Sequence, residues 1–580
     1  MNAFERKSTL VNRKFFQYLL PTILSNVAMS LNEFVDSIIV SHTLGTDAMG
    51  MVNLGYPVMF IFAVIYTCLG IGGSVVYAEY AGKQEGEKAK RSLSSVMILA
   101  LMVSVILTVS ALIFFKPLSG TLCKDPALIG EFDPYLRILI LSGLLIIPIQ
   151  IILNCLPALG NPMTGTVINI IANAVNLVMD YVYIQYFHTG LKGAAMATFT
   201  GYALGAVVLI FLCFIRKVVI PFTGFGESEI KELPNTCLRG AAPALNQLGY
   251  CIKVAFCNSL SFDLAGTLGV NIFTLCMQTV SIISIFIAGI IGAMMPIVAA
   301  LHGQGDRKGI RMLMKTVMIL QFITNLVLVA LLELFPGIVL FLYNVKEDMA
   351  APAILGLRIF SVLFVFRGFT LVFMYYFQII ERKTYALLIS AIDGFLGIIP
   401  VSLILTGFMG VNGIWATFPM VSILLFLGII VTNLVMVSRS DGKYRGLLLF
   451  ENDEEIPVFD STISLTEEDV VNAAKSLQEF CLRSDMDNSL SVLVALVAEE
   501  MGTYTMEQKE SKSLNEIDLL VKVYADKIVM DVRSIGKPFD ITSCEADRFS
   551  NIDVIRKTAS MIEYGYVTGM NQTRICVSKR

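Results

Sequence analysis

Charged side chains are scarce in this sequence. Asp, Glu, Lys and Arg account for 15% of its 580 residues, against about 25% in an ordinary soluble domain. Hydrophobic residues make up 56%, and the mean hydropathy is +0.73. A purely soluble protein is therefore disfavoured, and disorder is excluded. The net charge of −3 supplies no basic field, so we expect no nucleic-acid partner.

Histidines and paired cysteines are also scarce. The three histidines, His42, His188 and His302, are well separated, and the 11 cysteines include no CxxC pair. A His-rich metal site and a disulfide framework are both disfavoured by these spacings. We expect no metal, no organic cofactor and no enzyme activity.

Long apolar runs, by contrast, fill the first three quarters of the chain. About twelve are long enough for a helix to cross a bilayer core, which takes about 20 residues. They cover residues 15–41, 51–79, 92–115, 134–157, 162–186, 192–215, 238–262, 269–300, 311–336, 351–379, 384–407 and 411–437. Stretches such as LILSGLLIIPIQIIL lack the polar face of a soluble helix. The sequence therefore predicts an all-α polytopic membrane protein with twelve transmembrane helices.

Charge density rises after Ser438, which divides the chain into two kinds of sequence. We expect two six-helix lobes at 1–215 and 238–437, joined by a linker at 216–237. A separate domain of ordinary soluble size follows at 441–580.

Lys and Arg gather in alternate loops and at both ends of the membrane part. Examples are Arg6, Lys83, Arg307 and Arg439, which share one side of the membrane if the runs alternate. The positive-inside rule places that side, with both termini, in the cytoplasm. We expect a multi-pass membrane protein, with membrane lipids as partners.

An internal repeat relates the two lobes. At an offset of 220 residues, Gln84, Lys88, Arg91 and Leu93 match Gln304, Lys308, Arg311 and Leu313. The alternative is chance similarity of apolar sequence, but these matches are polar residues in matching loops. Six helices repeated by six point to parallel repeats, as in transporters that alternate access around a central cavity.

Ionisable residues within the apolar runs are costly and need a reason. In the first lobe they are Glu33 and Asp36 in run one and Asp180 in run five, where Asn176 shares the face of Asp180. Thr198 in run six adds a hydroxyl to that set. Such a cluster of oxygens suits a proton or Na⁺. The alternative is that the acids lie near helix ends and reach water.

These residues also carry a family resemblance. Pro21, the stretch NEFVD at 32–36, the Asn176 to Asp180 segment and GAAMAT at 193–198 resemble the multidrug and toxic compound extrusion (MATE) transporters, in particular their DinF-like branch. The resemblance covers about residues 10–437. It implies a small-molecule substrate exported against inward movement of H⁺ or Na⁺.

The resemblance also implies roles for individual residues. It places the cation-coupling site at Asp36, Asn176, Asp180 and Thr198. It makes Pro21 the point at which the first helix bends, since proline lacks the N–H and clashes with the preceding turn.

The second lobe departs from the other bacterial branch of that family, which carries carboxylates in runs seven and ten. Here those runs hold Lys253 and Arg367, and run eleven holds Asp393. We expect Lys253 or Arg367 to pair with Asp393, which lowers the cost of burying both charges. The alternative is that a cationic group faces the cavity and favours an anionic or zwitterionic substrate.

The last domain mixes strands and helices. Helical patterns occupy 466–484, 488–508 and 552–563, the stretch 515–534 predicts two strands, and 572–578 predicts a final strand. This α/β order resembles the GHKL-type ATP-binding domain of anti-sigma-factor serine kinases, through Ala498-Glu499-Glu500, Ser534 to Phe539 and Tyr566 to Cys576.

The nucleotide site of that family is degenerate here. Four residues after Glu499 and Glu500 stand Thr503 and Tyr504, where the family has an Asn for Mg²⁺, and its Asp-x-Gly reads Ser534-Ile535-Gly536. No glycine-rich phosphate loop is visible. We expect no ATP binding and a regulatory role towards a cytoplasmic protein.

Two function classes remain. The first is a cation-coupled secondary exporter of drugs or metabolites with an appended regulatory domain. The second is a membrane-tethered signalling protein that acts through the anti-sigma-like domain. A lipid-precursor flippase is a further possibility within the same architecture.

Overall fold

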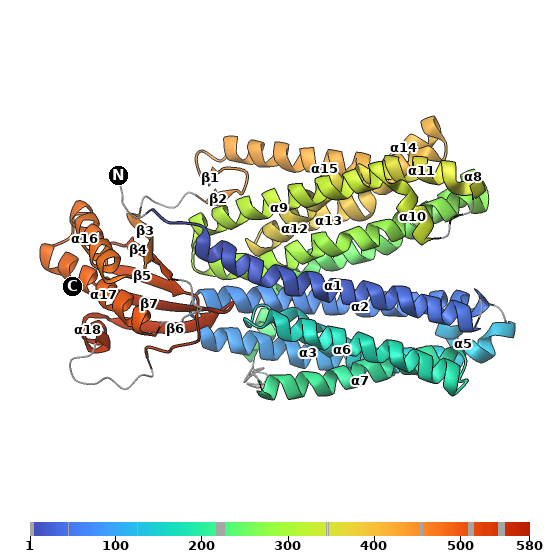
Figure 1. The fold of residues 1–580 in the computed structure, drawn as a ribbon, viewed down its shortest axis with the longest axis horizontal. Helices are drawn as coiled ribbons and strands as arrows, with labels where there is room; N and C mark the ends of the chain where they lie inside the picture. Colours follow the sequence, from blue (N-terminus) through green and yellow to red (C-terminus); the bar gives the residue numbers. More distant parts are fainter. Residues whose placement is uncertain are drawn as a thin grey trace.

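A long helical body makes up most of the molecule, and a smaller domain with a β-sheet covers one end of it (Figure 1). The computed structural model describes residues 5–44, 46–124, 126–215, 227–343, 345, 347–451, 456–508, 515–542 and 551–579. We call the end that bears the small domain the capped end, and the opposite one the far end. The N-terminal residues lie at the capped end.

The first seven helices form the first lobe. They are α1 (Thr9–Leu44), α2 (Thr46–Gly82), α3 (Gly86–Ile113), the short α4 (Phe115–Leu122), α5 (Pro126–Cys155), α6 (Pro162–Asp180) with the π-helical η1 (Tyr181–Tyr186), and α7 (Leu191–Ile215). A helix satisfies its own backbone hydrogen bonds, which is why apolar runs of this length fold as helices in a bilayer.

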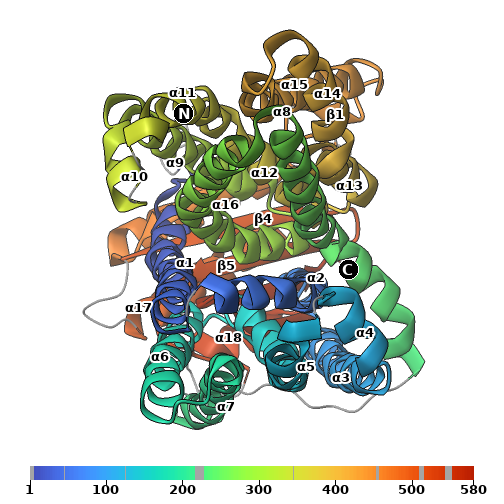
Figure 2. The ribbon, with the colours of Figure 1, turned by 90° about the vertical axis from the view of Figure 1, so that its right-hand side faces the viewer.

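The second lobe follows the same plan. It contains α8 (Glu227–Gly303), α9 (Arg307–Leu334), the short α10 (Pro336–Leu342), α11 (Glu347–Ser361), α12 (Leu363–Ile379), α13 (Lys383–Ala391), the π-helical η2 (Ile392–Leu396), α14 (Ile398–Met409) and α15 (Asn412–Ser438). Figure 2, seen from the far end, shows the two lobes one above the other with strands of the small domain behind them.

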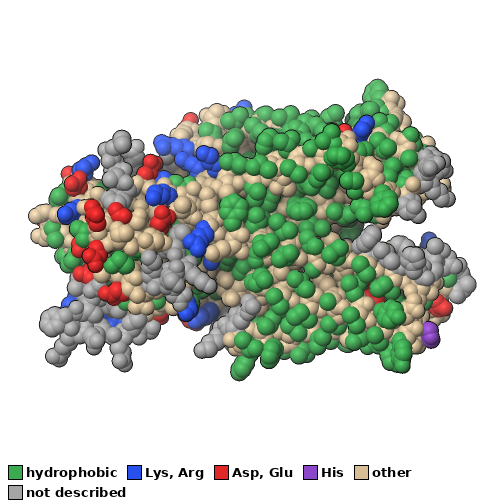
Figure 3. Space-filling model, viewed as in Figure 1, with side chains coloured by type: hydrophobic (Ala, Val, Ile, Leu, Met, Phe, Trp, Pro, Cys, Tyr) green, Lys and Arg blue, Asp and Glu red, His purple; other side chains and the backbone are tan. Residues whose placement is uncertain are grey.

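Ten helical segments of the described chain are long and apolar enough to cross a membrane. Apolar side chains cover the flank of the body, and Lys and Arg gather near the capped end (Figure 3). One segment, Ile230–Gly303, is interrupted at Gly266, whose φ of 58° and ψ of −146° favour glycine. The break divides α8 into two arms, 227–265 and 267–303. The structure therefore has a polytopic membrane body.

The expected linker is shorter than the sequence suggested. Residues 227–237 belong to the first arm of α8 rather than to a loop. Charged residues such as Glu227, Lys231 and Glu232 extend that helix beyond its apolar part, and the hydropathy pattern did not reveal this. Residues 216–226 lie outside the described part of the chain.

Helix boundaries show the repeat more clearly than residue matches do. Helices α3 and α9 begin at Gly86 and Arg307, and α4 and α10 begin at Phe115 and Pro336, a spacing of 221 residues in both cases. The offset of 220 is therefore one residue short at this point. The duplicated plan is a property of the backbone as well as of the sequence.

Close packing of α2 against both arms of α8 joins the lobes. A Cβ added at Gly240 would lie 1.7 Å from the carbonyl oxygen of Cys68, and one at Gly82 would lie 2.2 Å from that of Ala300. Only glycine allows backbones this close together. The two lobes thus meet helix to helix along the part of the body that leads to the capped end.

A buried ion pair crosses the same contact. Arg239 of α8 lies 2.7 Å from Glu79 of α2, and its guanidinium also donates to the carbonyl oxygen of Ile379 (2.9 Å). Both side chains are almost inaccessible to solvent. A buried pair in this position fixes the register of α2 on α8.

The C-terminal domain has two layers. Its strands are β3 (Val458–Ser464), β4 (Glu516–Val523), β5 (Lys527–Ser534), β6 (Met561–Val567) and β7 (Met570–Ser578), all antiparallel, in the order β3-β4-β5-β7-β6. Helices α16 (Glu467–Arg483), α17 (Asn488–Glu507) and α18 (Asn551–Thr558) share one apolar core with the sheet. They cover the face turned away from the helical body (Figure 1).

Most of the elements expected in this domain are confirmed, but one is wrong. The two strands within 515–534, the helices at 466–484 and 488–508 and the final strand are present. The helix predicted at 552–563 ends at Thr558, and Met561–Val567 forms β6. Pairing with β7, which places Met561 opposite Cys576, decides the conformation of that segment.

A two-stranded hairpin precedes the domain. It consists of β1 (Tyr444–Arg445) and β2 (Phe450–Glu451). The hydroxyl of Tyr376 donates to the carbonyl oxygen of Leu448, and Asn433 donates to that of Leu447, both over 2.9 Å. Residues 444–451 therefore pack on the membrane body, and the sheet begins after them.

The close contact at Gly240 predicts a strong effect of adding one methyl group. We expect Gly240→Ala to lower the free energy of unfolding by about 1–3 kcal/mol, because backbone must move to admit the Cβ. Thermal unfolding in detergent measures this. Gly428→Ala on α15 is the control, since a Cβ there meets no atom within 4 Å and alanine gains up to about 1 kcal/mol of helix propensity. Equal stability of both variants would contradict the packing.

Candidate functional site

A cavity of about 450 Å³ lies between the two lobes. Its walls come from α1, α2, α5 and α6 of the first lobe and from α8 and α12 of the second. The polar lining consists of Thr22, Ser25, Asn26, Tyr66, Ser74, Gln150, Asn154, Thr166, Asn169, Asn246, Gln247, Ser284, Arg367 and Tyr375. The surface between the lobes is notched at the far end (Figure 3).

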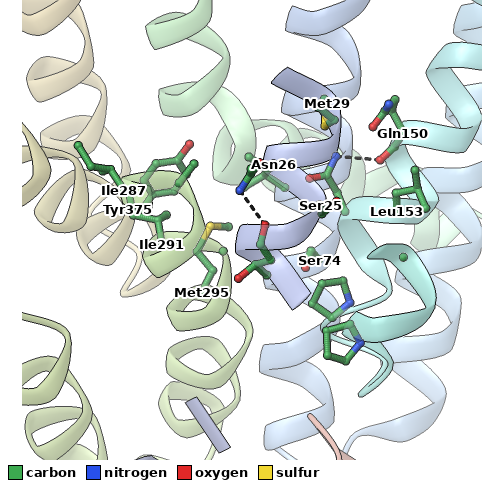
Figure 4. Close-up of a pocket in the computed structure, with 18 of the residues that line it drawn as sticks. Ser25, Asn26, Met29, Ser74, Gln150, Leu153, Ile287, Ile291, Met295 and Tyr375 are labelled. Carbon is green, nitrogen blue, oxygen red and sulfur yellow. Dashed lines mark hydrogen bonds between the residues drawn. The ribbon is translucent and has the colours of Figure 1, made fainter. Parts of the chain in front are cut away.

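Side chains from both lobes face the cavity. Ser25 and Asn26 project from α1 between Gln150 of α5 on one side and Ile291 of the second lobe on the other (Figure 4). Met295 lies beside Ile291 and adds a flexible apolar surface. The cavity thus offers amides and hydroxyls next to an apolar wall, as small-molecule sites commonly do.

The middle of α1 is hydrogen-bonded to α6. The hydroxyl of Thr166 donates to the carbonyl oxygen of Pro21 over 2.8 Å, and Asn169 donates to the Ser25 hydroxyl over 2.6 Å. Pro21 lies inside the continuous helix α1. A hydrogen bond from a neighbouring helix to a proline-containing turn is a contact that bending of α1 at Pro21 would change.

The acidic pair of the first lobe is brought together. Asp36 of α1 and Asp180 at the end of α6 interact electrostatically and are within hydrogen-bonding reach of each other. Asp180 is fully buried, and neither of its oxygens has a hydrogen-bond donor among the described residues. The amide nitrogen of Asn176 is also buried, and it too lacks a partner in the part of the chain that the structure describes. Two neighbouring carboxyls in an apolar setting favour a bound cation.

The other residues predicted for this cluster are placed less closely. The hydroxyl of Thr198 donates to the carbonyl oxygen of Ala194 in its own helix (3.1 Å). Asn176 packs on α7 at Gly201, one turn beyond Thr198. The side chain of Glu33 lies outside the described part of the structure.

In the second lobe, one carboxylate meets two cations. Asp393 lies 3.4 Å from the ammonium of Lys253 and 3.6 Å from the guanidinium of Arg367, and its Oδ2 accepts from Asn246 over 3.0 Å. Lys253 also donates to the backbone carbonyl oxygen of Asp393 (3.1 Å). All three charged groups are buried. Arg367 faces the cavity at the same time, so both sequence alternatives describe part of its environment.

The penultimate helix of each lobe contains a π-helical segment beside its acidic residue. Asp180 immediately precedes η1, and Asp393 is the second residue of η2. Such segments widen the helix and often occur at functional sites. The two lobes treat the buried acid differently: in the first it meets another acid, and in the second it meets two bases.

The cavity amides were not found from the sequence. Asn26, Gln150, Asn154 and Asn169 are scattered through three apolar runs, and each is unremarkable there. The sequence contained one pattern that could have revealed part of this set. A face of α6 that carries Asn169, Asn173 and Asn176 at helical spacing continues from the cavity to the acidic cluster.

The nucleotide-like residues of the last domain lie on α17 and at the end of β5. Glu499 and Glu500 lie half-buried on α17, where burial and the neighbouring acids Glu499 and Glu507 raise the pKa of Glu500. Ser534 is buried at the end of β5. The carbonyl oxygen of Gly536 accepts from the hydroxyl of Tyr566 (3.2 Å). The ATPase-like identity of this domain stays a prediction.

A duplicated helical body with an apolar flank and a polar cavity between its halves defines a multi-pass membrane transporter. The chain belongs to the MatE family, whose sequence profile matches residues 21–182 and 241–403, more than half of the chain. This is a family of transporters rather than of enzymes.

Curated relatives match the membrane part. The chain is 25% identical over 344 residues to the Probable multidrug resistance protein NorM of Thermotoga maritima, covering 56% of this chain and 71% of that protein. It is 20% identical to the FAD transporter of Shewanella oneidensis, covering 52% and 67%. For the DNA damage-inducible protein F of Escherichia coli the identity is 21%, and the chain spans less than half of that protein, 46% of its length.

Solved structures share the fold. An outward-facing MATE transporter of the MOP superfamily superposes with a TM-score of 0.69 at 21% identity, covering 73% of this chain and 95% of that one. A MOP superfamily transporter from Pyrococcus furiosus, described as having a binding pocket of reverse polarity, gives 0.66 at 21% identity, with coverages of 72% and 94%. These likenesses establish the architecture of the membrane body.

Removing the single acid of the second-lobe triad leaves two buried cations without a counter-charge. We expect Asp393→Asn to lower the free energy of unfolding by about 3–5 kcal/mol, measured by unfolding in detergent. The control is Asp263→Asn, which changes an exposed carboxylate of α8 and stays within about 0.5 kcal/mol of the parent. A small effect of Asp393→Asn would show that the triad is not an ion-pair network.

Proposed function

We propose that this protein is a secondary exporter of small molecules coupled to H⁺ or Na⁺. The observation that carries the proposal is the buried pair Asp36 and Asp180, whose carboxyls face each other without a basic partner among the described residues. A proton or Na⁺ bound there removes the repulsion between them. Binding and release of that cation supply free energy to the conformational cycle.

The membrane topology of the proposal has twelve spans. To the ten segments it adds α1, with 36 residues, and counts the two arms of α8 separately. The basic residues near the capped end support our proposal that this end, both termini and the C-terminal domain lie in the cytoplasm of a bacterial cell. The notch at the far end then faces outward.

Alternating access follows from the two-lobed plan. The cavity lies between lobes that are packed together towards the capped end, and parallel repeats commonly rock about such a site. Asn169 in the cavity and Asn176 beside the acids lie two turns apart on α6. If binding of the cation changes the packing of α6, it therefore also changes the substrate cavity, because both sites use residues of this helix.

The family relatives suggest substrates to test. Their printed names include multidrug resistance proteins and an FAD transporter. A cavity of about 450 Å³ suits a small molecule, which favours export over the lipid-precursor flippase. The signalling alternative needs a working nucleotide or partner site in the last domain, and Ser534 and Gly536 supply no carboxylate for adenine. We infer a regulatory role for that domain.

The coupling pair is tested in proteoliposomes with an imposed pH or Na⁺ gradient. With FAD and ethidium as transported probes, we expect Asp36→Asn and Asp180→Asn each to reduce gradient-driven transport by about tenfold or more. The physical reason is that a neutral amide carries no negative charge, so the repulsion that the cation would remove is absent. Asp263→Asn, which changes an exposed carboxylate of α8 in the second lobe, serves as the control and keeps full transport. Unchanged coupling in both acidic variants would refute the site.

A further inference from the structure

The second-lobe triad leaves one positive charge uncompensated. Lys253 and Arg367 share a single carboxylate, Asp393, and Lys253 takes its Oδ2 together with its backbone oxygen. Arg367 reaches only Oδ1, at 3.6 Å. Its side chain is 92% buried, and its Nε has no hydrogen-bond partner among the described residues. A buried guanidinium with spare donors is an incomplete arrangement.

The described lining of the cavity offers no acidic side chain to complete it. Arg367 lines the cavity, and none of the described lining residues is Asp or Glu. The other polar groups of the described lining are amides and hydroxyls, and the amides include Asn246 and Gln247 of α8. An organic cation needs a carboxylate or an aromatic cage, whereas planar guanidinium donors suit a carboxylate or phosphate.

From this geometry we propose that the cavity binds a small polar molecule bearing one anionic group, which pairs with Arg367, while its remaining groups bond to the amides. The inference rests on the proposed export function but concerns binding alone. Replacing Arg367 by Gln leaves Lys253 and Asp393 as a balanced pair, so the variant is expected to fold.

Equilibrium binding to the purified full chain tests the proposal. The probes are riboflavin 5′-phosphate and riboflavin, which share one ring system and differ by the anion, and binding is read from flavin fluorescence. We expect the phosphate ester to bind about tenfold or more tightly, and Arg367→Gln to abolish that preference. Arg367→Lys keeps part of it. The matched control is Arg358→Gln, a half-exposed arginine of α11, which leaves it intact.

Equal binding of the two flavins, no binding of the phosphate ester, or a preference that survives Arg367→Gln would each overturn the proposal. No ion gradient is used, so the result is independent of cation coupling. Loss of coupling in Asp36→Asn with retained phosphate preference would separate the two sites.

A different observation concerns the C-terminal sheet. Along β4, Ile517, Leu519 and Val521 point to the helices, so Asp518 and Lys522 point to the opposite face. That second face is charged along β3, β5 and β7 too, yet it is buried. A polar sheet face normally lies in water. Here it covers the capped ends of both lobes (Figure 1).

One ionic cluster ties three parts of the chain together. Asp306, from the turn before α9, lies 2.8 Å from Arg6 of the N-terminus and 2.5 Å from Arg533 of β5. Arg6 also lies 3.5 Å from Asp518 of β4. Burial alone raises the pKa of Asp306, but Arg533 and Arg6 outweigh it and hold that pKa far below its usual value. The carboxylate therefore stays ionised at physiological pH.

Gln572 of β7 contacts both lobes. Its side-chain oxygen accepts a hydrogen bond of 2.7 Å from Gln304, in the turn after α8. Gln572 donates in turn to the carbonyl oxygen of Gly82 at the end of α2 (3.4 Å), and Gln84 donates to its backbone oxygen (3.5 Å). Lys14 of α1 adds a bond to the carbonyl oxygen of Gly569 (2.8 Å). The β6–β7 hairpin thus lies across the contact between the lobes.

We infer that the C-terminal domain is a clamp that holds the two lobes together at the capped end, so that opening of this end requires its release. The inference rests on the proposed alternating access, and it specifies how opening of the capped end is regulated. Each transport cycle must break the contacts to at least one lobe. A factor that bound the released charged face would raise the rate of opening.

Two native cysteines report on the closed state. The Cys68 thiol of α2 lies 3.4 Å from the carbonyl oxygen of Cys237 of α8, and the two thiols are neighbours. Oxidation of the purified full chain with copper phenanthroline, followed by mass spectrometry of linked peptides, measures how often this contact is closed. Cys68→Ser removes the cross-link and calibrates the assay.

We expect Arg533→Gln to reduce the cross-linking rate at least about threefold, because Asp306 loses one of its partners. Gln304→Ala tests the same clamp from the transporter side without altering the domain. Arg483→Gln, an exposed arginine on α16, is the matched control with unchanged rate. Rates equal to the parent in both clamp variants would overturn the inference. The assay needs neither substrate nor gradient, so its outcome does not depend on export.

Discussion

Glycine-mediated packing of α2 against α8 is the contact on which the remaining geometry depends. At Gly82 and Gly240 the backbones approach so closely that no side chain fits between them. The lobes are therefore joined on the side of the capped end, and the cavity lies between them beside this contact, with Tyr66, Ile71 and Ser74 of α2 in its lining. The same packing brings the turns at Gln84 and Gln304 together and so creates the surface on which the last domain docks.

Burial of charge in a low-dielectric body explains the difference between the lobes. A carboxylate there needs a counter-charge or a bound cation. Asp393 has two basic partners, which makes the second lobe electrostatically self-sufficient except for the spare donors of Arg367. Among the described residues, the charged neighbour of Asp180 is another acid. The first lobe is thus the part at which we propose that an external cation binds, although both lobes follow one plan.

The docking of a charged sheet face follows the same rule. Asp306, Arg6 and Arg533 exclude water from one another, and each charge is compensated by a neighbour from a different part of the chain. Such a cluster is specific rather than strongly stabilising, because desolvation offsets much of the attraction. A contact of this kind holds a defined arrangement and yet separates without exposing a large apolar surface, which suits the releasable clamp that we propose.

Local sequence was enough to predict the helices, the two lobes and the strands on either side of 525–526, because hydropathy and periodicity are set by near neighbours along the chain. It also singled out Asp36 and Asp180 as acids within apolar runs. Tertiary structure alone decided the amide-lined cavity, the sharing of Asp393 by Lys253 and Arg367, and the start of strand β6 at Met561, within the helix predicted at 552–563. It also decided that the charged sheet face is covered. Each of these depends on residues far apart in sequence, whose partners are fixed only when α2 meets α8 and β6 meets β7.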